Sequence, residues 1–237
     1  MPPAILVTGA SGAIGFEIAA QAAEAGAVVG VHGSSPESVA RAIERLRARV
    51  PDGQPIAAPG DFRAEGAIER IFDAMAAEAG RIDAVIHCGI AGSDAGRITG
   101  PFAATEPVAY ADHAARVLGT VQRLAFAALP HLARQRGTFI AFASDAGRFA
   151  APRQSLVGAA FGGVMAFVRN LAVEAARDGV RVHCIAPGFV RDTPAFARAG
   201  LGLPTPADIA PLALFLCGPG ATKITGQVIS VNGGLNA

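Results

Sequence analysis

The chain has 237 residues, of which 51% are hydrophobic and 16% charged, and its formal net charge at pH 7 is +1. This length and composition predict one globular domain with a large core, and the scattered basic residues exclude nucleic acid as the expected partner. Because no uninterrupted apolar run reaches the roughly 18 residues of a membrane-spanning helix, we expect no membrane segment.

The start of the chain and the cysteines predict a cytoplasmic protein. An apolar run begins within a few residues of Met1, which leaves no room for a signal peptide ahead of it. Cys88, Cys184 and Cys217 are odd in number and far apart, which is typical of reduced thiols and not of a disulfide framework or a metal site. We therefore expect no bound metal.

Strand and helix patterns alternate along the whole chain. Apolar runs bounded by turn residues predict strands at 4–7, 28–32, 55–59, 82–87, 137–143, 180–185 and 227–231. Helical spacing predicts helices at about 13–25, 36–50, 64–79, 106–129, 155–178 and 206–217, the fourth ending at Pro130, with a Gly-rich loop over 89–104. This alternation predicts a parallel sheet covered on both faces, with ligands at the carboxyl ends of its strands.

The glycines over 8–15 stand between the first strand and the first helix. Gly9 suits unusual turn dihedrals, Gly12 leaves room for a closely approaching pyrophosphate, and Gly15 lets the helix pack against the strand. The free N–H groups and the positive dipole of a helix start favour anionic phosphates. In this context the spacing predicts a dinucleotide-binding turn, and the alternative is a tight turn without a ligand.

An ordered series of motifs resembles the short-chain dehydrogenase/reductase family over the whole chain. The motifs are the glycine turn, Gly60-Asp61-Phe62, the strand that leads to Ser144, the stretch 180–190 with its Pro-Gly loop, and the C-terminal stretch 224–234. The resemblance implies one Rossmann-like domain over 1–237, α/β in class, with a doubly wound parallel sheet in a three-layer αβα sandwich. It also implies assembly into a homodimer or homotetramer.

The resemblance further implies where a nicotinamide dinucleotide is held and which residue keeps a catalytic role. Ser144 is the catalytic serine by this alignment. The cofactor-binding positions lie in the glycine turn and after the second, third, fourth and sixth strands: Gly9, Ser11, Gly12, Ile14, Gly15, Ser34, Ser35, Asp61, Phe62, Cys88, Gly89, Pro187, Gly188 and Val190.

The end of the second strand favours NADP(H) over NAD(H). Proteins that bind NAD place an acidic residue there for the ribose hydroxyls, and that position is Gly33 here. Ser34 and Ser35 could donate hydrogen bonds to a 2′-phosphate. The arginine that helps NADP-binding relatives falls on Ser11, and Arg41 is a possible substitute. A chain that binds neither nucleotide stays an alternative.

The proton-transfer pair of the family is missing by this alignment. That chemistry needs a tyrosine and a lysine at i and i+4 of one helix, because the lysine charge lowers the tyrosine pKa so that the phenol exchanges a proton with the substrate. Aligned from Ser144, these positions are Val157 and Phe161. The only tyrosine, Tyr110, and the only lysine, Lys223, lie elsewhere.

Other family positions differ as well. The Asn-Asn-Ala-Gly turn after the fourth strand reads His-Cys-Gly-Ile over 87–90. The asparagines of the long central helix and of the sixth strand fall on Arg116 and His183, and the threonine after the Pro-Gly loop falls on Asp192. The cofactor turn therefore matches the family closely, whereas the proton-handling site does not.

Three functions remain open. The first is a catalytically silent homologue or the inactive subunit of a hetero-oligomer with an active relative. The second is an NADP(H)-dependent reductase for a small carbonyl, hydroxyl or acyl substrate, with water, Ser144, a charged loop residue or Tyr110 as proton donor. The third is a lyase or cyclase, for which the charged residues Arg116, Asp145, Arg148 and Arg153 would converge on an anionic group.

Overall fold

The computed structural model describes residues 1–89, 95–191 and 203–235. It contains one 7-stranded sheet in the order β3-β2-β1-β4-β5-β6-β7, in which every neighbouring pair is parallel. The strands are β1 Ala4–Thr8, β2 Val28–Val31, β3 Gln54–Ala57, β4 Ala84–His87, β5 Thr138–Phe142, β6 Arg181–Pro187 and β7 Val228–Val231. The predicted doubly wound α/β fold is confirmed.

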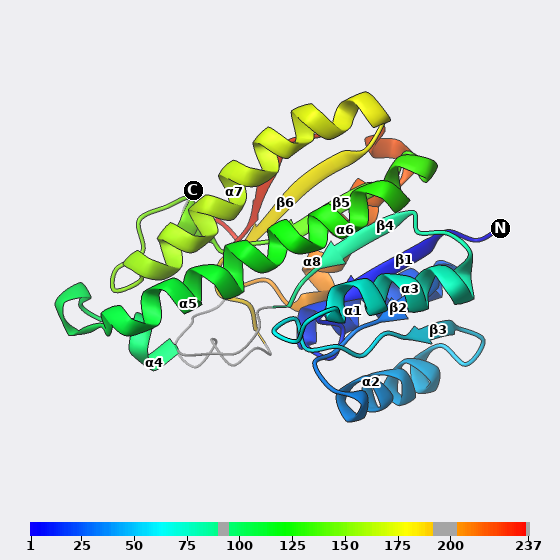
Figure 1. The fold of residues 1–237 in the computed structure, drawn as a ribbon, viewed down its shortest axis with the longest axis horizontal. Coiled ribbons are helices and arrows are strands. Elements are labelled where there is room, and N and C mark those ends of the chain that lie inside the picture. Colours follow the sequence, from blue (N-terminus) through cyan, green and yellow to red (C-terminus); the bar gives the residue numbers. More distant parts are fainter. Residues whose placement is uncertain (90–94, 192–202, 236–237) are drawn as a thin grey trace.

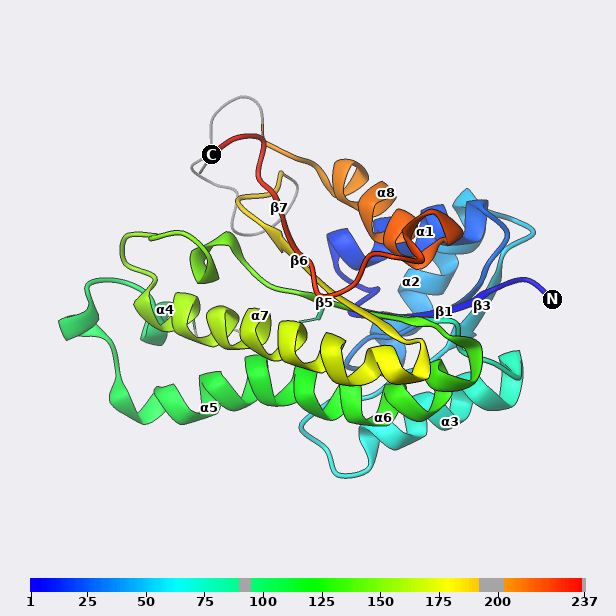
Figure 2. The ribbon, with the colours of Figure 1, turned by 90° about the horizontal axis from the view of Figure 1, so that it is seen from above.

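Two helical layers cover the sheet. The helices are α1 Ala13–Glu24, α2 Pro36–Arg49, α3 Ala67–Ala79, α4 Ala95–Ile98, α5 Tyr110–Ala114, α6 Thr120–Gln135, α7 Ser155–Ala175 and α8 Pro206–Cys217, and a π-helical turn over Ala115–Gly119 joins α5 to α6. Figure 1 shows the strand arrangement, and Figure 2 shows α1, α2 and α8 on one face with α3, α6 and α7 on the other. This is the three-layer sandwich that the family resemblance implied.

Alternation along the central strands divides the core between the two faces. Leu6 of β1 packs with the α3, α6 and α7 layer, whereas the next residue, Val7, packs with the α1, α2 and α8 layer. Val85 and Ile86 of β4 divide in the same way. All four side chains are fully buried, and burial of such a side chain contributes about 1.5–3 kcal/mol.

The helix predicted to stop at Pro130 continues through it, so that prediction was wrong. Helix α6 runs to Gln135 with Pro130 in its interior. Pro130 removes one backbone N–H, but its side chain is exposed, and the carbonyl left without that partner belongs to Phe126 on the exposed side of the helix. The last turns are held by packing, because Leu132 is fully buried and His131 stacks on Phe72 of α3.

Helix α7 is strongly apolar although less than half of its most apolar window is buried. The stretch Ser155–Asp178 has a mean hydropathy of 1.7 and is long and apolar enough, by length and composition alone, to cross a membrane, although only 39% of the 18-residue window is buried. Our expectation from uninterrupted runs did not detect it, because Arg169 and Asn170 interrupt the run without lowering the mean below that limit. In this fold the helix packs along β6.

Candidate cofactor and catalytic site

The strand order reverses between β1 and β4, which lie side by side in the middle of the sheet (Figure 1). Thr8 at the end of β1 is in register with His87 at the end of β4. In parallel α/β sheets ligands bind outside the carboxyl ends of the strands at such a switch point. The glycine turn begins there, directly after Thr8.

The three glycines of the turn meet three different surroundings. A Cβ on Gly9, whose φ is +80°, would lie 2.6 Å from the Cα of Gly89. A Cβ on Gly15 would lie 2.3 Å from the carbonyl oxygen of Gly9, so helix and strand approach too closely for any side chain there. A Cβ on Gly12 would meet only that same oxygen at 3.4 Å, and Gly12 is exposed. Gly9 and Gly15 therefore shape the turn, and Gly12 keeps its outer side open.

The turn fits a pyrophosphate. Gly12 is the N-cap of α1, and no side chain caps that helix end. The N–H of Gly12 closes the turn by donating to the Gly9 carbonyl at 3.0 Å. Ser11 is exposed and Ile14 is half-buried at the first turn of the helix. An uncapped helix start beside an open glycine is the arrangement that binds phosphate oxygens through backbone N–H groups.

Gly33 after β2 has no side chain, and two serine hydroxyls lie close to it. A Cβ on Gly33 would lie 2.4 Å from the Oγ of Ser38 and 3.2 Å from the Oγ of Ser11. Ser35 caps α2, because its Oγ accepts the Ser38 N–H at 3.3 Å. Ser34 is exposed. The Ser35 Oγ thus serves as an acceptor for the helix end, whereas Ser34 is accessible to solvent.

Asp61 and Phe62 follow β3 and differ in their environment. The Arg63 guanidinium bonds both oxygens of the Asp61 carboxylate, the closest at 2.5 Å, and lowers the pKa of that carboxyl below its usual range. The Phe62 side chain is buried in the core. Asp61 is therefore ionised near neutral pH, and Phe62 has only its backbone to offer a ligand.

A buried histidine under the glycine turn was missed by the sequence analysis. The Gly9 N–H donates to His32 Nδ1 at 3.0 Å, and His32 Nε2 lies 2.9 Å from the Gly60 carbonyl oxygen. Burial lowers the pKa of His32 to about 4. The signal was present in the sequence, because a histidine at the end of a buried strand beside a glycine turn needs polar partners.

His87 and Cys88 are poor candidates for proton transfer at neutral pH. His87 is buried, its Nδ1 lies 2.8 Å from Thr8 Oγ1, and burial lowers its pKa to about 3. Burial also raises the pKa of the Cys88 thiol above its usual range. Both side chains are therefore neutral at pH 7. Ile90, the last residue of this predicted turn, lies outside the described residues.

Ser144 lies where β5 passes into a short 3-10 turn over Asp145–Gly147, and its Oγ accepts the Ala146 N–H at 3.3 Å. Helix α7 presses on this turn, because a Cβ on Gly158 would lie 2.6 Å from the Ala146 carbonyl oxygen. Val157, the preceding residue, is half-buried against the core, and Phe161 is buried in it. Neither side chain carries an ionisable group.

Asp145 forms a buried junction that sequence analysis did not find. Its carboxylate accepts the Ser230 hydroxyl at 2.6 Å and the Asn232 side-chain N–H at 2.5 Å. It lies beside the Pro-Gly loop, since a Cβ on Gly188 would stand 3.6 Å from Asp145 Oδ2. Pro187 is buried. The junction joins the Ser144 turn, β7 and this loop.

The charged residues predicted to converge have separate partners. Arg148 donates to the Val228 carbonyl at 3.0 Å, and Arg116 bonds Asp112 within the α5–α6 stretch. Arg153 is exposed at a φ of 66°. These contacts give no added support to the lyase hypothesis.

The remaining predicted positions that the structure describes are buried or have partners on neighbouring segments. Val190 is buried, and the side chain of His183 is buried within β6. The Tyr110 hydroxyl lies 2.6 Å from Thr105 Oγ1 on the neighbouring segment. Asp192 lies outside the described residues. Within the described part of the chain, no three His, Cys, Asp or Glu side chains gather in a possible metal site.

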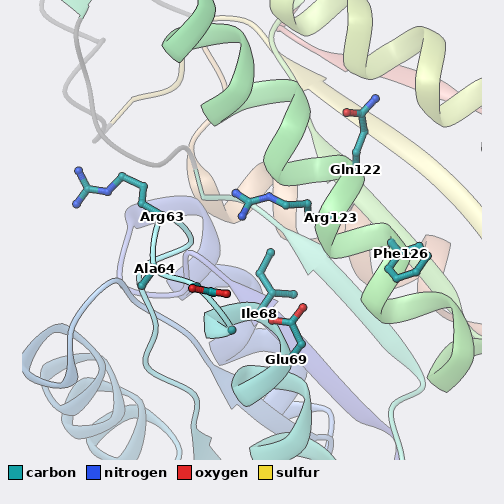
Figure 3. A pocket seen from close by; sticks show the side chains of 9 residues that line it. Arg63, Ala64, Ile68, Glu69, Gln122, Arg123 and Phe126 are labelled. Carbon is teal, nitrogen blue, oxygen red and sulfur yellow. The ribbon is translucent and has the colours of Figure 1, made fainter.

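A separate hollow of about 460 Å³ lies between the start of α3 and the middle of α6 (Figure 3). Arg63 and Arg123 line it together with Glu65 and Glu69. Its charges are mixed, and Phe126 at its edge is 83% exposed. None of the predicted site residues lines this hollow.

Comparisons with known proteins agree with the fold and the turn. A family model described as enoyl-(acyl carrier protein) reductase matches residues 9–236. The 3-oxoacyl-(acyl-carrier-protein) reductase FabG of Chlamydia muridarum is 31% identical over 249 residues, covering 98% of this chain and 96% of the relative. The enoyl-(acyl-carrier-protein) reductase FabI of a Synechocystis species is 28% identical over 236 residues, covering 93% and 90%.

Solved structures are similar over the whole chain. A short-chain type dehydrogenase/reductase from Mycobacterium ulcerans has a TM-score of 0.89 at 29% identity and covers 98% of this chain and 89% of its own. A variant of the actinorhodin polyketide ketoreductase with NADPH has a TM-score of 0.88 at 25% identity, covering 100% and 98%.

The parallel sheet and the glycine turn place the chain among the Rossmann-like α/β proteins. The match of the family model and the full-length relatives identify the family within that class. The chain belongs to the short-chain dehydrogenase/reductase family.

Proposed function

We propose that this protein binds NADP(H) and has lost the ordinary proton-transfer step of the family. In this proposal it acts as a silent homologue or as the inactive subunit beside an active relative. The observation that carries the proposal is the pair Val157 and Phe161 on the helix that presses on the Ser144 turn. Both are apolar, and Phe161 is only 5% exposed.

The chemical argument concerns the proton. A bound nicotinamide cofactor supplies the hydride, and the protein must supply a proton to the substrate oxygen. Val157 has no proton to give, and Phe161 supplies no positive charge that would lower the pKa of a neighbouring acid. General acid catalysis contributes about 10²–10⁴-fold, so we expect turnover to be reduced by that factor even when the cofactor is bound.

The choice of NADP(H) is supported by the space around Gly33. No acidic side chain stands there for the usual contact with the ribose hydroxyls of NAD, and Ser38 Oγ lies close to the position that a Cβ would take. The exposed Ser34 hydroxyl and the exposed Ser11 hydroxyl supply donors without negative charge. A 2′-phosphate therefore meets no repulsion on this side.

A second candidate is an active NADP(H)-dependent reductase with another proton donor. The observation in its favour is Ser144, whose hydroxyl lies at the strand end and accepts one backbone N–H while keeping its own proton to donate. Relatives are named for acyl groups on a carrier protein, so an acyl substrate is the class to test first.

The partner we propose is a second chain of this family, identical or active, in the cytoplasm. Phe126 of α6 is 83% exposed and Val173 of α7 is 75% exposed, in the same helical layer (Figure 2). Exposed apolar residues gathered in one layer favour a protein interface.

The test is NADPH consumption by the purified chain across a panel of carbonyl and acyl substrates. We expect turnover about 10²–10⁴-fold below that of an active relative, and the same low rate in Ser144→Ala. Turnover by the wild-type chain that Ser144→Ala abolishes would overturn the silent-homologue proposal and support the reductase. Activity that appears only after mixing with an active relative would support the inactive-subunit form.

A further inference from the structure

His32 is a buried, titratable residue that the proposed chemistry does not use. It follows β2, and its side chain is 3% exposed. Two contacts hold the imidazole ring in place. Each of its nitrogens faces a backbone group of a different loop. One side chain thus connects two loops that are separated in the sequence.

The two hydrogen bonds determine the state of the ring. The Gly9 N–H is a donor, so His32 Nδ1 must be the unprotonated acceptor at 3.0 Å. Nε2 faces the Gly60 carbonyl at 2.9 Å and must therefore carry the proton. The neutral Nε2–H tautomer satisfies both contacts. Gly9 opens the pyrophosphate turn, and Gly60 directly precedes Asp61 and Phe62.

Aromatic packing holds the ring in this orientation. His32 stacks on Phe62 with ring centroids 4.4 Å apart and an interplanar angle of 10°. Phe62 meets the edge of His87 at 5.7 Å, and His87 returns to Thr8 through the contact of 2.8 Å. Because Thr8 and Gly9 are consecutive, the contacts form a closed loop beneath the glycine turn.

We propose that His32 is a positioning residue that couples the pyrophosphate turn at Gly9 to the loop over 60–62, which carries the expected cofactor positions Asp61 and Phe62 and which we call the adenine-side loop, since the family resemblance implies adenine contact there. This inference rests on the proposed dinucleotide binding. Phosphate binding by the turn and adenosine binding by the loop then depend on one imidazole. A ligand that contacts both loops binds more tightly when their separation is already fixed, because ordering the loops on binding then costs less entropy.

Two substitutions separate the two contacts. His32→Asn places an amide oxygen near the position of Nδ1 and keeps an acceptor for Gly9, but it is too short to reach Gly60. His32→Gln places an amide N–H near the position of Nε2 and keeps a donor for Gly60, but loses the acceptor for Gly9. His32→Phe keeps the stacking surface against Phe62 and loses both hydrogen bonds.

The experiment compares two probes by calorimetry, adenosine for the adenine-side loop and NADPH for both loops. Amide hydrogen exchange at Gly9 and Asp61 provides a second readout that needs no ligand. We expect His32→Gln to expose the Gly9 N–H to exchange and to weaken NADPH about tenfold while adenosine binding is unaffected, as loss of one buried hydrogen bond implies. We expect His32→Asn to keep Gly9 protected and to weaken both probes.

Four outcomes decide the inference. The pattern above supports it. If each probe binds the three variants with the same affinity as the wild type, the inference is overturned while the proposed function stands. A parallel loss of melting temperature and of both affinities in all three variants, with no difference at Gly9, would also overturn it, because His32 would then serve the fold alone. Wild-type protein that fails to bind NADPH overturns the proposed function, and the inference with it.

Discussion

Phe161 lies directly against Gly147, where a Cβ would stand 2.7 Å from the Phe161 carbonyl carbon and 3.0 Å from its Cβ. This contact fixes the register of α7 on the turn that follows Ser144. The helix cannot slide or rotate to bring another residue to the positions of Val157 and Phe161 without a backbone collision. If the proton-transfer pair is lost, as we propose, a shift of the helix does not replace it.

Restoring the pair is expected to have unequal effects at the two positions. Val157 is half-buried, so Val157→Tyr is expected to fold and to raise NADPH-dependent turnover by about 10²-fold or more, the lower range of general acid catalysis. Phe161→Lys buries an unpaired charge and is expected to cost about 3–5 kcal/mol of unfolding free energy. Turnover assays and urea unfolding check the two effects.

The matched control for the tyrosine variant is Val157→Phe, which adds the ring without the hydroxyl. An equal gain in turnover with Val157→Phe would contradict the proton-transfer argument. Wild-type turnover as fast as that of Val157→Tyr would contradict it as well.

Substitutions in the glycine turn are expected to separate folding from cofactor binding. Gly12→Ala has space for its methyl group, so we expect the unfolding free energy to change by less than about 0.5 kcal/mol. NADPH affinity is expected to fall at least about tenfold, because the methyl group stands where the pyrophosphate approaches. Gly15→Ala meets the Gly9 carbonyl and is expected to cost about 1–3 kcal/mol in stability.

Gly26→Ala is the control for backbone strain, since Gly26 has a φ of +84° and no neighbour within 4 Å of its Cβ position. It is expected to lower stability without changing NADPH affinity. Calorimetry and thermal unfolding on the same samples make the comparison. Unchanged NADPH affinity in Gly12→Ala would contradict the assignment of the turn.

Stability is expected to fall as the pH is lowered from 7 to 5. Burial lowers the pKa of His32 to about 4 and that of His87 to about 3, whereas in the unfolded chain each titrates near 6.5. The stabilising contribution is present above the unfolded pKa and is lost as the pH falls toward the folded value, because the unfolded state binds the proton first. At pH 5 each histidine is expected to have lowered the unfolding free energy by roughly 2 kcal/mol.

Urea unfolding at a series of pH values tests this dependence. Asp61 and His87 are the ionisable groups that act on His32, and Asp61 keeps its charge over this range because its own pKa is lowered by Arg63. The slope of the unfolding free energy against pH reports the protons taken up on unfolding. His32→Gln is expected to reduce this uptake by about one proton. A slope that stays the same in this variant would show that His32 does not titrate on unfolding.

Oligomer formation is expected to depend on the α6–α7 layer. Phe126→Arg places a charge on the 83% exposed position and is expected to shift sedimentation toward the monomer. The matched control is Phe215→Arg on α8, which lies in the opposite layer and is 50% exposed. Equal dissociation in both variants, or none in Phe126→Arg, would contradict the proposed interface.

Local sequence signals predicted much of the fold and part of the site. Helix α8 was predicted at its observed ends, where Thr205 and Asp208 form a capping box, and Ser35 caps α2 one residue before its observed start. Both signals lie within a few residues along the chain. The end at Pro130 was wrong because packing of Leu132 outweighs the one lost backbone hydrogen bond.

Long-range polar contacts were outside the reach of this reasoning. Asp145 and Ser230 are 85 residues apart in sequence and meet only because β5, β6 and β7 are neighbours. His32 meets Gly60 for the same reason, through the pairing of β2 with β3. A single sequence shows that such buried polar residues need partners but not which ones.

The most direct measurement is a calorimetric titration of the purified chain with NADPH and with NADH. The account predicts that NADPH binds at least about tenfold more tightly than NADH, a difference of about 1.4 kcal/mol, because Gly33 leaves no acidic contact for the ribose. Binding of neither nucleotide would contradict the account, since the glycine turn would then be a structural feature alone.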